Sequence, residues 1–400
     1  MRHCLAAASA GLVLTWALLL TAAPQLGDIE LTHPAIQYAK PADDPIARLL
    51  RREGAIAGLT SEGRSGYLRS VLQALDVPLS SQILVFSQGS VQSSRINAGN
   101  PRSLFFNDSV VVGWVRGGFI EIAAEDPQQG TVFYVLDPSV FGRVSIQRSD
   151  SCLSCHYPYR TGGVPGMIEP MGHGRPIERR WGGWYVTGDA GSNAHLGNVD
   201  IRTLTTGTEP AKATSVKSLE RVFDTSGYLT PYSDLAALMV FEHQMQMMNL
   251  ITRLGWETRV ATQEGRLDAK KTIIAERVNE LVDYMLFVGE APLTSKMTGT
   301  SGFAEAFSAR GPSDAKGRSL RQLDLTARLM RYPCSYLIYS EQFDRLLDEA
   351  KDAVYRRLWA VLSGTDRDAK YRHLSAPDRR AIVEILRDTK PQLPPYFRVS

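Results

Sequence analysis

The residues most able to do chemistry are gathered in SDSCLSCHYPYR, residues 149–160. Cys152 and Cys155 lie three positions apart and His156 follows directly, in a chain that has only 4 cysteines. At this spacing, two thiols can form thioethers to the two vinyl groups of one haem while the adjoining histidine coordinates the iron. We therefore expect Cys152, Cys155 and His156 to hold one covalent haem c, with His156 as the proximal iron ligand.

Other chemistries compete for this motif. A thioredoxin-like redox pair needs a βαβ context, whereas loop residues surround these cysteines and no helix start is evident after Cys152. A zinc site needs two further ligands at familiar spacing, and the sequence has no second cysteine pair. A disulfide between Cys152 and Cys155 would close a very small loop and gain little stability. The pair has no other cysteine nearby, because Cys4 lies in the N-terminal segment and Cys334 lies in an apolar run where burial is expected. Haem attachment explains such an isolated pair.

The stretch resembles the haem-binding motif of c-type cytochromes, here single and intact. Longer segments such as TGGVPG, RWGGWYVTG and RYPCSYLIYS are similar to large bacterial proteins that carry a cytochrome c domain and have no assigned reaction. The motif is specific for haem, whereas the longer likeness implies no particular reaction. The chain departs from the small all-helical cytochrome c domain, since the residues before Cys152 are typical of strands.

The ligand on the second face of the iron would separate an electron carrier from a site open to small molecules. Loop candidates lie in GVPGMIEPMGHG and SNAHLGN, and each has an ordinary structural explanation as a loop side chain. A helix expected from Ser233 supplies a further candidate. The candidates for the sixth ligand are Met167, Met171, His173, His195 and His243.

The helix expected from Ser233 is apolar around most of its circumference, which predicts burial. Glu242, Gln246, Asn249 and Arg253 nevertheless follow one another at steps of four, three and four, forming a polar stripe beside His243. One explanation is a hydrogen-bonded seam against the loop region, with His243 a satisfied core histidine. The other places His243 on the distal haem face, as ligand or acid/base, with Glu242 or Gln246 orienting its ring.

Arginines and aromatic residues cluster after the motif. Arginine guanidinium groups can pair with the two haem propionates through forked hydrogen bonds, and aromatic rings can wall the porphyrin. Solvated arginines and ordinary aromatic packing are the structural alternative. The residues concerned are Arg160, Arg175, Arg179 and Arg180 for the propionates, and Trp181, Trp184 and Tyr185 for the walls.

The order of patterns predicts an α+β fold with a β-rich region before a helical one. Short β-branched and aromatic runs, separated by Gly, Pro, Asn and Asp, predict five or six antiparallel strands, with a further strand at GGWYVTG. Helices are expected near 44–54, 62–77, 233–255, 270–290, 320–332, 340–364 and 375–388. The expected regions are 1–23, a signal peptide or N-terminal anchor; 24–81, a linker with short helices; 82–147, β-rich; 148–230, the haem c-binding loops; and 231–400, helical.

The first 23 residues combine a short basic start with a long apolar run, which predicts export and a periplasmic location. If the segment is not cleaved, it is the expected membrane anchor. Lys+Arg 45 against Asp+Glu 42 gives a net charge of +3 with both signs interspersed, which gives no support for nucleic-acid binding.

The function expected from these features is electron transfer by an exported single-haem protein, with a redox partner protein or a small electron donor or acceptor. A haem enzyme of peroxidase or oxidase type is the alternative, in which His243 and Glu242 would be the catalytic candidates at an open distal site. A haem-bearing sensor or binding module is the third hypothesis.

Overall fold

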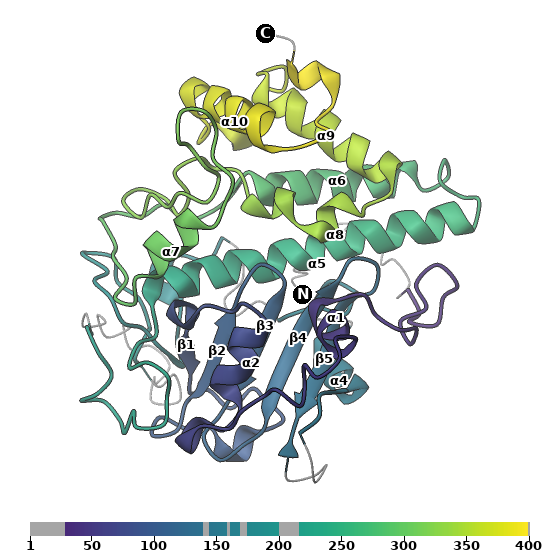
Figure 1. The fold of residues 1–400 in the computed structure, drawn as a ribbon. Coiled ribbons are helices and arrows are strands. Elements are labelled where there is room, and N and C mark those ends of the chain that lie inside the picture. Colours follow the sequence, from purple (N-terminus) through teal and green to yellow (C-terminus); the bar gives the residue numbers. More distant parts are fainter. Residues whose placement is uncertain (1–28, 139–143, 158–160, 169–173, 200–215, 399–400) are drawn as a thin grey trace, which may run out of the picture.

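The fold combines one antiparallel sheet with helices that lie mostly in the C-terminal part of the chain (Figure 1). This computed structural model describes residues 29–138, 144–157, 161–168, 174–199 and 216–398. The sequence prediction of an antiparallel sheet followed mainly by helices is confirmed at this level.

Within these residues the sheet has seven strands in the order β6-β5-β4-β3-β2-β1-β7, each antiparallel to its neighbours. The expected strand in GGWYVTG is present as β7 and pairs with β1 at one edge. The strands are β1 (Ile83–Val85), β2 (Arg102–Phe106), β3 (Val110–Trp114), β4 (Ile120–Asp126), β5 (Gly130–Leu136), β6 (Gln147–Arg148) and β7 (Trp184–Tyr185).

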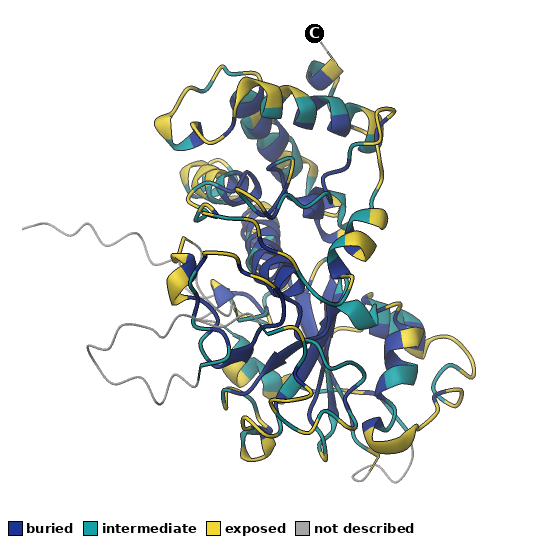
Figure 2. Cartoon of the chain, turned by 90° about the vertical axis from the view of Figure 1, so that its left-hand side faces the viewer, coloured by how far each residue is buried: buried dark blue, intermediate teal, exposed yellow. Residues whose placement is uncertain are grey.

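Most side chains of the central strands are buried on both faces of the sheet, which is why runs such as VVVGW read as continuously apolar. The short helices α1 (Pro45–Leu50) and α2 (Leu68–Ala74) lie on one face, which we call the outer face. The long helix α5 (Leu235–Gln263) packs with Phe106, Ala123 and other residues of the opposite face, which we call the inner face. Figure 2 shows the buried residues concentrated in the sheet and along the helix that crosses it.

The turn between β4 and β5 is fastened to α5. Gly130 has φ +79°, a conformation that disfavours side chains, and a Cβ there would lie 2.6 Å from Thr252 Cγ2 and 2.9 Å from the Pro165 carbonyl. A glycine is therefore required where the hairpin, the helix and the loop after the Cys-x-x-Cys-His motif converge.

Helix α5 begins at Asp234, whose carboxylate accepts hydrogen bonds from the N–H groups of Ala236 (2.9 Å) and Ala237 (3.1 Å). Its second oxygen accepts from Thr300 N (2.7 Å) and Ser301 N (2.8 Å), which ties the helix start to a distant loop. The further helices are α4 (Leu153–His156), α6 (Lys271–Met285), α7 (Phe303–Ala309), α8 (Glu341–Asp344), α9 (Asp348–Leu362) and α10 (Ala376–Thr389).

Two helix predictions need correction. Residues 320–332 form no helix, because Asp324 accepts hydrogen bonds from the N–H groups of Thr326 and Ala327 and the chain folds back through a Leu323–Met330 bridge. The helix expected over 340–364 is two helices, α8 and α9, interrupted between them. The predicted cap at Ser375 is confirmed, with a reciprocal Ser375–Asp378 capping box.

Candidate functional site

The Cys-x-x-Cys-His motif occupies one turn next to the sheet. After β6, Ser149 N bonds to the Phe133 carbonyl (2.8 Å) and the chain enters a 3₁₀ turn, Asp150–Cys152, followed by α4. We expected no helix start after Cys152, and this expectation was wrong, because a single turn is too short to show a helical period. The turn places Cys152 and Cys155 three residues apart on one helical side. Both are free thiols, Cys152 half-buried and Cys155 exposed.

His156 is held by a hydrogen bond of its own. Its Nδ1 lies 2.9 Å from the Gly166 carbonyl oxygen, and its ring lies 4.8 Å from the ring of Phe133 on β5. A proton on Nδ1 that is donated to this carbonyl leaves the lone pair on Nε2, the form of imidazole that binds iron. This arrangement fits the role of a proximal ligand.

The carbonyl that holds His156 is itself positioned by α5. Asn249 Nδ2 donates to the Met167 carbonyl (2.8 Å), and a Cβ on Gly166 would lie 2.1 Å from Asn249 Oδ1. Gly166 is therefore needed for close approach of the loop to the helix. Asn249 belongs to the polar stripe predicted from the sequence, so this part of the stripe does face the loop region.

The other end of the stripe joins the segment after the motif. Glu242 Oε1 accepts from Trp181 Nε1 (3.0 Å), and its Oε2 lies 3.5 Å from Arg180 Nη1. Arg180 also pairs with Glu290 (3.0 Å) and is 5% exposed. Together with Asn249, these contacts support the interpretation of the stripe as a hydrogen-bonded seam.

His243 faces the helical region. Its Nε2 lies 2.8 Å from Ser335 Oγ, and its ring stacks on Phe287 (4.3 Å between centroids) and Tyr284 (5.2 Å). The residue is buried. These contacts are those of a satisfied core histidine, the first of the two explanations considered for it.

The inner face of the sheet has one incompletely buried patch. In the described strands β1 to β5 and β7, every residue is buried except Arg102, Glu121 and Val135. The register pairs Glu121 with Val135 and with Gly113, while Gly113 neighbours Leu104, two residues from Arg102. The three side chains therefore share one face and one end of the sheet. We call them, with Gly113, the inner-face patch.

An ion pair crosses this patch. Arg102 Nη2 lies 2.7 Å from Glu121 Oε2, with side-chain exposures of 18% and 14%. The guanidinium passes over Gly113, where a Cβ would lie 2.6 Å from Arg102 Nη2.

The patch adjoins the motif. Burial, followed by the Glu121 carboxylate, raises the pKa of the Cys152 thiol, while Ser149 and the Arg102 guanidinium oppose this rise. Cys152 also packs part-buried against the inner core, so the motif and the ion pair lie on the same side of the sheet.

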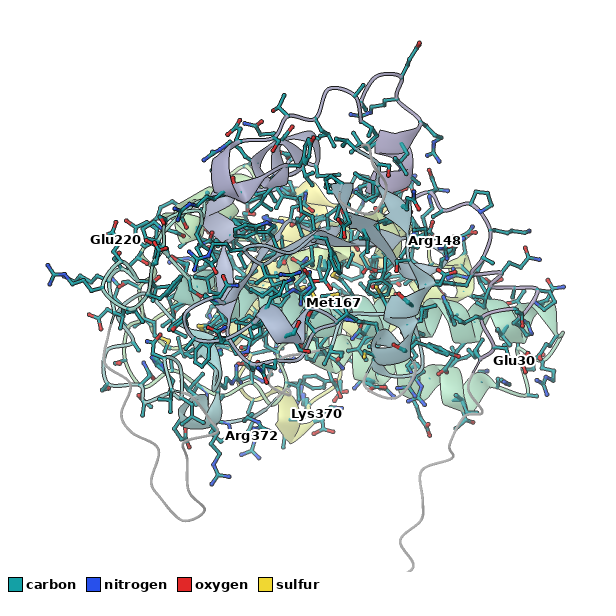
Figure 3. All side chains as sticks on the ribbon, turned by 90° about the horizontal axis from the view of Figure 1, so that it is seen from below. Glu30, Arg148, Met167, Glu220, Lys370 and Arg372 are labelled. Carbon is teal, nitrogen blue, oxygen red and sulfur yellow. The ribbon has the colours of Figure 1, made fainter. Side chains whose placement is uncertain are left out.

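The remaining ligand candidates are dispersed. Met167 packs part-buried against the inner core and lies towards the middle of the molecule in Figure 3. His195 is buried against Trp181 (5.1 Å) and accepts from Gly197 N (3.0 Å), and burial lowers its pKa to about 4. Met171 and His173 lie outside the described residues.

The residues expected to bind the propionates and to wall the porphyrin also lie in different parts of the structure. Arg160 lies outside the described residues, Arg175 and Arg179 are exposed, and Arg180 is buried in the seam. The aromatic residues belong to two different cores. Trp181 and Trp184 belong to the inner core, whereas Tyr185 belongs to the outer one, because successive strand residues point to opposite faces.

Sequence reasoning missed the inner-face patch and Gly166. A signal existed, since Gly113 interrupts the β-branched run SVVVGWV, and a glycine inside a strand often marks close approach of another group. Arg102 at the start of RSLFF gave no comparable sign.

No family model, curated protein or solved structure matches the chain. Within the described residues, no group of three or more His, Cys, Asp or Glu side chains is arranged to hold a metal ion. Nor does any helix in that part of the chain have the length and apolar character to cross a membrane.

Proposed function

We propose that this chain is a c-type haem protein that takes part in electron transfer. It holds one haem through thioethers at Cys152 and Cys155, with His156 as proximal ligand. The observation that carries the proposal is the hydrogen bond to the Gly166 carbonyl from Nδ1 of His156, which ends the turn that places both thiols on one side. A bound haem supplies one-electron redox chemistry.

The surroundings of the turn support haem over a redox dithiol. Reactive dithiol cysteines have a lowered pKa, whereas burial raises the pKa of Cys152. The inner-face patch beside Cys152 supports the proposal further, because it leaves one end of an otherwise buried face without a full cover.

The chain's own residues have distinct roles in this proposal. Asn249 and Gly166 fix the loop whose carbonyl orients His156, and the Glu242 seam fastens the following segment to α5. Residues 148–230 are then the haem-binding segment between the sheet and the helical region. The proposal includes export to the periplasm and a redox partner protein or small electron carrier, both from the sequence.

The test is to produce the chain in a bacterial host equipped for covalent haem attachment and to purify it. We expect a haem that survives acid extraction, a mass increase of one haem, and thiols at 152 and 155 that resist alkylation. The Cys152→Ser/Cys155→Ser variant should carry no covalent haem, while Cys334→Ser, which alters a buried thiol elsewhere, should retain it. Colourless protein with both thiols free to alkylate would overturn the proposal.

Spectra of the haem-loaded protein then separate the hypotheses for its function. Low-spin spectra that do not change with cyanide or carbon monoxide support electron transfer. High-spin ferric haem that binds cyanide readily would instead support the haem enzyme or the sensor. Turnover with peroxide would then distinguish those two hypotheses.

A further inference from the structure

A broad groove lies in the C-terminal helices, at the end of the molecule opposite α4 (Figure 1). It is formed by α9, α10, the turn between them and the last described turn, Pro395–Arg398. Its volume is about 1140 Å³, larger than most sites for small ligands. No residue of the Cys-x-x-Cys-His motif lines the groove.

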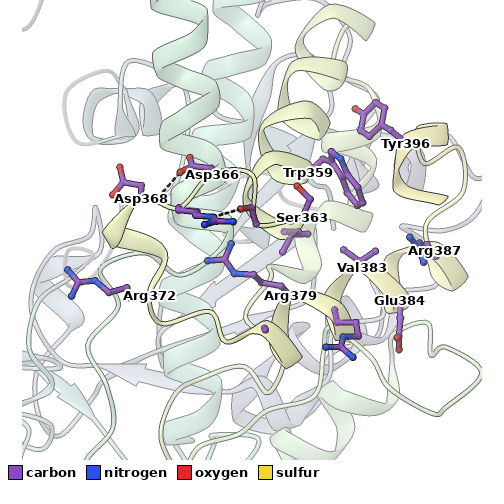
Figure 4. A pocket seen from close by; sticks show the side chains of 15 residues that line it. Trp359, Ser363, Asp366, Asp368, Arg372, Arg379, Val383, Glu384, Arg387 and Tyr396 are labelled. Carbon is purple, nitrogen blue, oxygen red and sulfur yellow. Dashed lines mark hydrogen bonds between the residues drawn. The ribbon is translucent and has the colours of Figure 1, made fainter. Parts of the chain in front are cut away.

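One part of the groove is apolar and aromatic. Trp359, Leu362, Val383 and Tyr396 line it, and the Trp359 ring packs on Phe397 (5.1 Å between centroids). Figure 4 shows Trp359 and Tyr396 on one side and Arg372 with Asp368 on the other.

The remainder of the groove is basic. Arg367, Arg372 and Arg380 are exposed, and none forms an ion pair within the described residues. Arg379 donates to the carbonyls of Leu374 and Tyr371 (3.2 Å each) and of Val361, and no carboxylate pairs with it among the residues that the structure describes.

Two of the three acidic residues of the lining are paired with cations. Asp366 pairs with Arg357 (2.6 Å), whereas Asp368 accepts from the backbone N–H of Lys370 (3.0 Å) and keeps its negative charge. Glu384 pairs with Lys316 (2.8 Å) and Arg318 (2.6 Å), which hold its pKa below the ordinary value. The groove therefore has a surplus of positive charge beside an apolar wall, in a chain whose charges are otherwise nearly balanced.

We propose that this groove binds an acidic segment of a partner protein that also presents apolar side chains. Carboxylates of the segment pair with the exposed arginines, and an apolar side chain packs on Trp359 and Val383. A peptide segment fits better than a small anion, because Arg372 lies on one side of the open groove and Trp359 and Tyr396 lie on the other. Charge complementarity of this kind sets specificity and association rate.

The experiment measures binding of a fluorescent synthetic peptide of alternating Glu and Leu to the full chain at low salt. We expect binding that weakens as salt rises and is absent for the matching peptide with Gln in place of Glu. The Arg367→Glu/Arg372→Glu/Arg380→Glu variant should bind at least about tenfold more weakly. The control variant Arg52→Glu/Lys217→Glu/Arg221→Glu makes the same charge change at exposed sites away from the groove and should stay within about twofold.

Contact with the apolar wall is tested separately. Trp359→Ala should weaken binding of the Glu-Leu peptide but not that of a peptide of alternating Glu and Ser. Three results would each overturn the proposal. These are an equal loss of peptide affinity in the control charge variant, displacement of the peptide by millimolar inorganic phosphate, and binding of anionic lipid vesicles without binding of the peptide.

Discussion

The two ends of strand β4 on the inner face of the sheet differ in what covers them. Glu121 and Glu125 are four residues apart on the same face, about 13 Å along the strand. Glu125 is buried, and its carboxylate meets Thr131 Oγ1 (2.5 Å) and Gln342 Nε2 (3.1 Å) from α8. Glu121 is partly exposed, and its described partner is Arg102.

The difference shows where the helical region stops covering the sheet. At the Glu125 end, Gln342 also bonds to Thr252 of α5, so two helices close the face through one polar network. At the Glu121 end, the inner-face patch lies on the side of the sheet where Cys152 packs part-buried against the inner core. The same protein surface is thus completed by its own helices at one end and, in our proposal, by haem at the other.

The largest expected effect concerns His156 and His243, which one of the hypotheses from the sequence placed on opposite sides of the iron. In haem-loaded protein, His156→Ala should remove an axial ligand and change the ferric spectrum and spin state. His243→Ala should leave the spectrum unchanged and lower the free energy of unfolding by about 2 to 4 kcal/mol, because it empties a stacked core position. Absorption spectra and denaturant unfolding measure both.

A changed spin state in His243→Ala, without loss of structure by circular dichroism, would contradict the core assignment of this residue. His373→Ala is the matched control. This exposed histidine bonds to the Leu286 carbonyl (2.7 Å), and its replacement should change neither measurement strongly.

The next effect sharpens the contrast at the buried end of β4. Burial raises the pKa of Glu125 to about 8, from an ordinary value of 4.5. Between these pH values the folded protein keeps a proton that the unfolded chain releases, so stability falls as pH rises. Glu125→Gln should remove this loss, worth about 1 to 3 kcal/mol between pH 5 and 8. Urea unfolding at several pH values measures this loss of stability. The prediction would be contradicted if the free energy of unfolding changed with pH by the same slope in the wild-type protein and in Glu125→Gln.

The open end of the face is tested by a double-mutant cycle. Gly113→Ala should cost about 1 to 2 kcal/mol, because its Cβ displaces the Arg102 guanidinium from Glu121. In the Arg102→Ser background the same change should cost nearly nothing. Equal costs in the two backgrounds would show that the guanidinium does not lie over Gly113.

The smallest effect tests the seam on α5. Asn249→Leu should cost about 1 kcal/mol, because it removes the hydrogen bond to the Met167 carbonyl. Gln246→Leu, on the same stripe but only part-buried, should change stability by less than about 0.5 kcal/mol. The seam would be unsupported if Gln246→Leu proved as costly as Asn249→Leu.

Much of the secondary structure was legible from local patterns. The strands from Ile83 onward are short runs of β-branched and aromatic residues, the long helix from Leu235 is a long apolar segment, and the capping box at Ser375 is a local signature. The missing helix in 320–332 shows the limit, since Asp324 offered the backbone hydrogen bonds that compete with a helix.

The site divides in the same way. The sequence by itself determined the cluster Cys152, Cys155 and His156, because the spacing needed is local, and it indicated that a polar stripe on a buried helix must find partners. Only the tertiary structure decided which partners those are: Trp181 and Arg180 for Glu242, the loop after Gly166 for Asn249, and Ser335 for His243. The inner-face patch joins residues from β2, β3, β4 and β5 through strand register, and register is fixed by contacts between segments far apart in the chain.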